Sequence, residues 1–192
     1  MEETKASGIA RAFRTYVDIV LFRKGPEDLP VSQRLLVITI GANMLLGLAF
    51  GSAMPLPETN RLGVAAIETV FLLAWYWALL RFAGRPERFL QTTSAIFGHQ
   101  TILLPAFMFV TWLYLSQPKD AQMQVHVILP LIVLALWTLA IGTRILRSAT
   151  QWPTGACVAL MLLQALVGQF LILSLFPEAA ANAAATAPAV TT

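Results

Sequence analysis

Five apolar stretches, each long enough to cross a lipid bilayer, constrain this chain more than any other feature. The hydrocarbon core of a bilayer is about 30 Å thick, so a spanning helix needs about 20 apolar residues. Because 57% of the 192 residues are hydrophobic and only 12% are charged, most of the chain must lie in lipid. We therefore predict an all-α polytopic membrane helix bundle with five transmembrane helices, at about 35–54, 62–80, 93–116, 126–143 and 155–176.

The segments on either side of these stretches are polar or weakly apolar. Residues 1–34 are predicted to be cytoplasmic and to contain an amphipathic helix over 8–23, in which apolar residues recur at helical spacing with Arg11 and Arg14 off that stripe. Such a helix either lies in the membrane interface or packs on the inner ends of the spans, and the sequence leaves both open. Residues 177–192 carry almost no charge and no large apolar side chain, which predicts a disordered external tail.

The basic residues are distributed very unevenly. Eleven of the 13 Lys and Arg residues precede the first span or lie in the loops after the second and fourth spans, leaving only Arg61 and Lys119 for the other side. By the positive-inside rule the N-terminus is then cytoplasmic and the C-terminus external. Seven of these cations are candidates for binding lipid headgroups or a protein partner: Arg11, Arg14, Arg81, Arg85, Arg88, Arg144 and Arg147.

Several polar side chains fall inside the predicted spans, where they are costly unless they are buried or paired. A rise of about 1.5 Å per residue sorts them into three layers by depth. From the outer side inward these layers are Glu68, Thr111 and Gln169; Asn43, Thr138 and Gln164; and Thr39, His99 and Thr101.

Glu68 is the one acidic residue within these spans. It should face the bundle and be paired or protonated, because an ionised carboxylate is costly in lipid. It is either a neutral acid hydrogen-bonded to Gln169 or Thr111, or a proton or ion site. His99 lies too deep for a direct pair with it.

The remaining sequence features favour structural roles. His99 shares a helical face with small residues and is either a packing histidine or a functional one. It and His126 lie at different depths, which argues against axial ligation of one haem. The single Cys157 allows no internal disulfide, and we predict no metal site and no cofactor. Trp75, Tyr76 and Trp77 suit an interfacial aromatic belt.

The sequence lacks the motifs of common enzymes and of nucleic-acid binding. It contains no P-loop, no G-x-S-x-G and no H-E-x-x-H motif, so we predict that the protein is not an enzyme. Its basic loops lack interleaved aromatic residues, so we expect no nucleic-acid partner.

Residues Phe89–Pro105, FLQTTSAIFGHQTILLP, carry a family resemblance. This stretch and the five-span arrangement resemble the Yip family, small membrane proteins that interact with Ypt/Rab GTPases and have bacterial relatives. Phe97-Gly98 and Pro105 occupy the places of the family's aromatic–glycine step and proline at the entry to its third span, although that aromatic residue is usually tyrosine. The resemblance implies a non-catalytic role in binding partners or shaping membranes.

These observations lead to two functional expectations. The first is a non-enzymatic adaptor, assembly or membrane-organising protein of a bacterial inner membrane, which binds lipid headgroups and a membrane-protein partner or a second copy of itself. The bacterial origin is inferred from the composition rich in Ala and Leu. The alternative is a small transporter or proton-coupled channel that uses Glu68.

Overall fold

The structure, a computed structural model, describes residues 2–53, 60–116 and 121–177, and this part of the chain contains helices and no strand. The α-helices are α1 (Glu2–Val20), α2 (Gln33–Ser52), α3 (Arg61–Phe82), α4 (Phe89–Ser116), α5 (Ala121–Thr150) and α6 (Thr154–Leu175). Two short 3-10 helices, η1 (Pro26–Asp28) and η2 (Pro86–Arg88), lie in the links between them.

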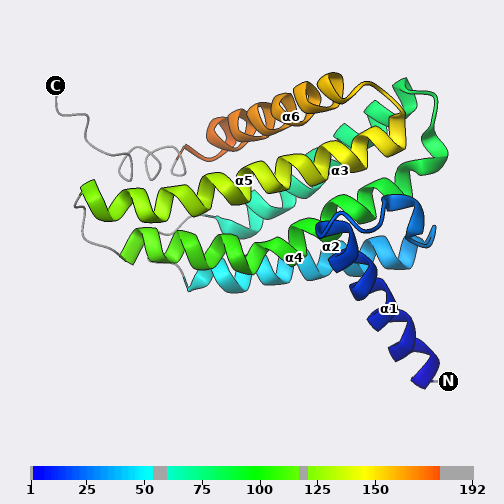
Figure 1. Cartoon of the computed structure of the whole chain (residues 1–192), viewed down its shortest axis with the longest axis horizontal. Coiled ribbons are helices and arrows are strands. Elements are labelled where there is room, and N and C mark those ends of the chain that lie inside the picture. Colours follow the sequence, from blue (N-terminus) through cyan, green and yellow to red (C-terminus); the bar gives the residue numbers. More distant parts are fainter. Residues whose placement is uncertain (1, 54–59, 117–120, 178–192) are drawn as a thin grey trace.

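The prediction of an all-α bundle with five membrane-length helices is confirmed. Helices α2 to α6 are long and apolar enough to cross a membrane and run side by side, whereas α1 leaves the bundle at one end (Figure 1). The turn after α2, the link after α4 and the predicted tail beyond Pro177 lie outside the described residues.

Helix ends are set by capping side chains. Ser32 accepts a hydrogen bond from the Leu35 backbone amide and begins α2, and Asn60 does the same for Gly63 at the start of α3. The guanidinium of Arg61 donates to the carbonyl of Gly51, which ties the start of α3 to the end of α2.

Helix α5 is longer than the sequence suggested. It begins at Ala121 and continues to Thr150, seven residues beyond the expected end at Thr143. The helix continues without a break through Arg144 and Arg147. Because it begins five residues before the expected start at 126, Pro130 is its tenth residue.

The bundle is tightly packed at one end only. We call this the basic end, formed by η1, residues 83–88 and residues 151–153. The buried side chains of α3 begin at Leu72. Among the α5 side chains that the structure describes, 126 and 128–150, the buried ones begin at Ile141, so in both helices they lie in the half nearer this end. In α4 an unbroken buried run covers 92–99, again near the basic end.

Helix α1 closes the basic end through one aromatic contact. The Tyr16 ring lies over Gly98 of α4, where a Cβ would come within 2.1 Å of the ring. The Tyr16 hydroxyl lies 3.0 Å from Oγ1 of Thr39 in α2, which in turn donates to the Leu35 carbonyl. Because Thr39 uses its one proton for Leu35, the tyrosine is the donor.

The C-terminal end of α1 is held by α5. Nε1 of Trp137 donates to the carbonyl of Val20 at 3.1 Å, and the Arg144 guanidinium donates to the carbonyl of Phe22. The Phe22 ring packs edge-on against Trp137 and under Arg144. A cation at a helix C-terminus is favourable because the last carbonyls carry negative partial charge.

We predict that Gly98→Val releases α1 from the bundle. The new side chain cannot share space with the Tyr16 ring, and overpacking of this kind costs about 1–3 kcal/mol. Amide hydrogen exchange over residues 12–20 should become faster. Gly41→Val is the matched control, because a Cβ on Gly41 meets no atom within 4 Å. Equal protection of α1 in both variants would contradict the docking contact.

Candidate functional site

The loosely packed half of the bundle contains two cavities. The first has a volume of about 570 Å³ and lies mainly among α2, α3 and α4. The second has a volume of about 590 Å³ and lies among α3, α4, α5 and α6. Six residues line both cavities, so the two adjoin: Glu68, Leu72, Gln100, Phe107, Thr138 and Ile172.

Glu68 stands between the two cavities. It lies seven residues into α3, about 10 Å along the helix from its start at Arg61. Its carboxylate makes no hydrogen bond and no ion pair with any residue that the structure describes. Its side chain is accessible to solvent and borders both cavities.

The two expected partners of Glu68 lie on different sides of it. Thr111 lines the first cavity, and Gln169 lines the second. Neither is hydrogen-bonded to Glu68 among the described contacts. The outer polar layer therefore exists as a cavity lining rather than as a bonded cluster.

Two pairs of polar side chains within the spans join neighbouring helices. Asn43 of α2 donates to Oγ1 of Thr101 in α4 at 3.3 Å. Tyr76 of α3 donates to Oε1 of Gln164 in α6 at 2.6 Å. Such pairs satisfy polar groups that lipid cannot, and they fix the register of neighbouring helices.

Depth alone did not identify these partners. The sequence placed Asn43 and Gln164 in one layer by depth, but the two residues belong to separate pairs, with Thr101 and with Tyr76. Tyr76 was assigned to an aromatic belt, yet it is fully buried. Consecutive helical residues point about 100° apart, so Tyr76 faces inward while Trp77 is exposed beneath the Arg81 guanidinium. Assigning each residue to a face of the helix, and not only to a depth, would have separated Tyr76 from Trp77.

Two buried polar atoms at the second cavity have no described partner. Nδ1 of His99 lies 3.2 Å from the carbonyl oxygen of Ala95, whereas its Nε2 is unpartnered. Oγ1 of Thr138, which lines both cavities, is also unpartnered. An unpaired buried polar group costs about 1–3 kcal/mol, so water or a ligand in the cavity would relieve both.

The candidate arginines at the basic end fall into two groups. Four contact the protein: Arg85 donates to Gln151 at 2.6 Å, Arg88 to the Ser148 carbonyl at 2.6 Å, Arg144 to the Phe22 carbonyl, and Arg81 stacks on Trp77. The guanidiniums of the other three make no contact with a described side chain or carbonyl, and all three side chains are exposed: Arg11, Arg14 and Arg147.

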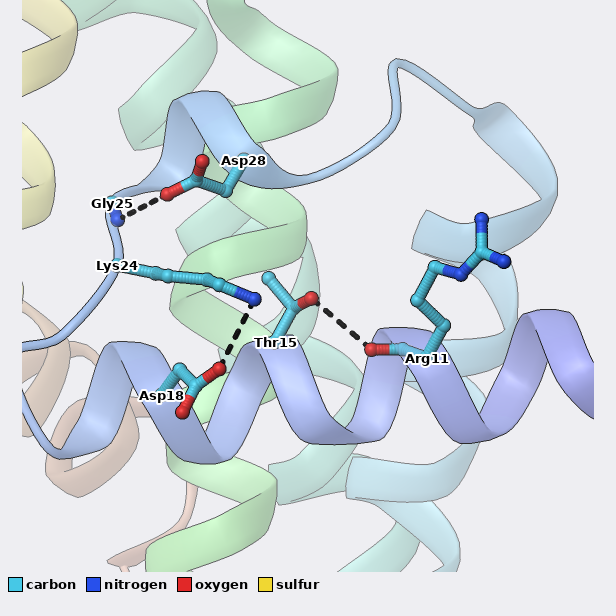
Figure 2. Close-up of polar contacts among 6 residues, drawn as sticks. All are labelled: Arg11, Thr15, Asp18, Lys24, Gly25 and Asp28. Atoms are coloured by element: carbon cyan, nitrogen blue, oxygen red, sulfur yellow. Dashed lines mark hydrogen bonds and ion pairs between the residues drawn. The ribbon is translucent and has the colours of Figure 1, made fainter.

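Several polar groups near the free arginines of α1 are paired with one another. Figure 2 shows Lys24 reaching back to Asp18 at 3.1 Å and Asp28 accepting from the Gly25 amide at 2.9 Å. Thr15 donates to the Arg11 carbonyl, but the Arg11 guanidinium points away from these residues. The cation is therefore available to a partner outside the chain.

Tyr16 is neutral where it docks α1. Burial raises the pKa of its phenol above the usual 10.0. The hydrogen bond to Thr39 is thus retained through neutral pH, and α1 stays attached by an uncharged contact.

Among the described residues, no group of three or more His, Cys, Asp or Glu side chains could hold a metal ion. Cys157 is buried and is not in a disulfide. The polar groups of the cavities are instead spread over five helices.

Comparison with known proteins identified no relative. No protein-family model matches the sequence, no curated protein matches it, and no solved structure matches the fold.

We predict that Tyr76→Phe destabilises the bundle by about 1–3 kcal/mol, because Gln164 keeps a buried oxygen without its donor. Reversible unfolding in mixed micelles would measure this loss. Adding Gln164→Leu should recover part of it, since both polar partners are then absent. Tyr114→Phe is the matched control, as that hydroxyl has no described partner. Equal stability of the two single variants would contradict a structural role for the pair.

Proposed function

We propose that this chain is a non-enzymatic adaptor or membrane-organising protein of a bacterial inner membrane, with its N-terminus in the cytoplasm and its C-terminus outside. One observation carries the proposal: α1 projects from the basic end (Figure 1), and Arg11, Phe13 and Arg14 on it are exposed.

The chemistry of α1 suits an anionic membrane surface. Arg11, Phe13 and Arg14 are all exposed within one turn, and the Phe13 side chain is 58% accessible. A helix that combines basic and aromatic side chains binds the headgroup region, because the ring enters the acyl boundary while the cations meet anionic lipids. Each basic residue contributes about 1 kcal/mol near such a surface.

The charges support the proposed orientation. The basic end holds cations that the positive-inside rule assigns to the cytoplasm, and α1 projects from that end. The resemblance of Phe89–Pro105 to the Yip family supports a role in binding a membrane-protein partner or a second copy of the chain.

We expect anionic lipid to order α1. Amide hydrogen exchange over residues 10–20 should slow when the protein moves from phosphatidylcholine nanodiscs to phosphatidylglycerol nanodiscs. Replacing both Arg11 and Arg14 with Gln should abolish this difference, because these guanidiniums are free to meet headgroups.

Arg85→Gln is the control for this lipid response, because Arg85 is bonded to Gln151 within the protein. It should keep the full difference between the two lipids. Identical exchange in both lipids for the unsubstituted protein would refute headgroup binding by α1.

A second function is favoured by the cavities on either side of Glu68. A small transporter or proton-coupled channel needs an ionisable group within the membrane that solutes can reach, and Glu68 borders both cavities. The packed half at the basic end would then form the closed side of an alternating-access cycle.

Proteoliposomes test this second function. With a potassium-diffusion potential imposed, proton entry should occur with the unsubstituted protein and fall to the level of empty liposomes with Glu68→Gln. Glu87→Gln removes an exposed carboxylate at the opposite end of the bundle and should leave the flux unchanged. A flux that survives Glu68→Gln would exclude Glu68 as the carrier site.

A further inference from the structure

We infer that the paired cavities bind a protonated lipophilic amine, with its nitrogen between Glu68 and the second cavity and its apolar body among the surrounding side chains. This inference rests on the second function above for the role of Glu68, and it names the class of molecule that would occupy the cavities. Amine binding and proton transport are measured in separate experiments, so the ligand and the transport function can be refuted independently.

The charge of the ligand follows from the charges that line the cavities. Glu68 is the acidic residue there, and Arg61, at the mouth of the first cavity, already donates to the Gly51 carbonyl. The cavity residues from α2, α5 and α6 are uncharged, and α4 contributes one titratable group, His99. A carboxylate without a described cation is best neutralised by a cationic ligand.

The hydrogen-bonding groups favour an ammonium that carries N–H donors. With the His99 Nδ1 proton directed to Ala95, the unpartnered Nε2 is an acceptor. Oγ1 of Thr138 can also accept, and the carboxylate of Glu68 accepts only. These acceptors all line the second cavity, where a primary or secondary ammonium would be a donor matched to the lining.

The body of the ligand must be apolar. Most of the lining is aliphatic or aromatic, including Phe107 in both cavities, Phe97 in the first and Phe71 in the second. Aromatic faces also attract cations. Each cavity has the size of a small-molecule site, about 300–1,000 Å³.

Two kinds of molecule carry this chemistry, a free lipophilic amine and the amine headgroup of phosphatidylethanolamine. The test therefore uses 1-aminoadamantane, with 1-adamantanol as an uncharged molecule of the same shape. Calorimetry on the full chain in nanodiscs of phosphatidylglycerol should show the amine binding at least tenfold tighter than the alcohol. Equal binding of the two molecules would overturn the inference.

Two variants, each with a control, test whether the amine binds in these cavities. Glu68→Gln should weaken amine binding at least tenfold and remove its dependence on pH, because proton and ammonium compete for that carboxylate. Glu87→Gln should leave binding unchanged. Gly47→Leu keeps Glu68 but fills the first cavity, where a new Cβ meets no atom within 4 Å, so it should also weaken binding. Gly41→Leu is its control, since Gly41 has similar open space but lines neither cavity.

The lipid source is distinguished by adding phosphatidylethanolamine to the nanodiscs. If the headgroup occupies the site, the apparent affinity for 1-aminoadamantane falls and the protein retains phosphatidylethanolamine over phosphatidylglycerol during delipidation. If the ligand is a free amine, the affinity is unchanged. Amine binding that is unaffected by both Glu68→Gln and Gly47→Leu would refute the site, whereas Glu68-dependent binding without proton flux would refute only the transport function.

Discussion

The contact of the Tyr16 ring with Gly98 is the interaction on which the closed end of this bundle depends. It requires a residue without a side chain on α4 and brings α1 against α2 and α4 together. The carbonyls at the end of α1 are then within reach of Trp137 and Arg144 on α5. The Tyr16 side chain thus joins α1, α2 and α4, and the buried run 92–99 of α4 includes its contact at Gly98.

Closing one end so tightly leaves the other half of the bundle to be held by fewer contacts. There α2 is joined to α4 by the pair of Asn43 with Thr101, and to α3 by the bond from Arg61 to the end of α2. Polar pairs hold helices in register without filling the space between them. The cavities beside Glu68 are the space that remains.

The architecture could be predicted from sequence because lipid imposes a simple rule: a spanning segment must satisfy its own backbone, and helices do so over about 20 apolar residues. The partners of individual side chains could not be predicted in this way, because depth along a helix does not specify which way a residue faces. Glu68 was recognised from its cost in lipid, whereas Tyr76 was missed because a tyrosine near a helix end resembles a belt residue. The role of Gly98 was also hidden, since a helical glycine indicates a close approach but not its partner.

Only some of the 13 Lys and Arg residues are available to a membrane or a partner. Arg85, Arg88 and Arg144 donate to groups of the protein itself, and two of these acceptors are backbone carbonyls. Those arginines stabilise the junctions between helices and lose freedom to reach headgroups. Arg11 and Arg14 of α1 make no such bond, whereas the nearby Thr15 and Asp18 are paired with groups of the protein. Cations that join helices and cations available for recognition are therefore different residues, and α1 carries two of the second kind.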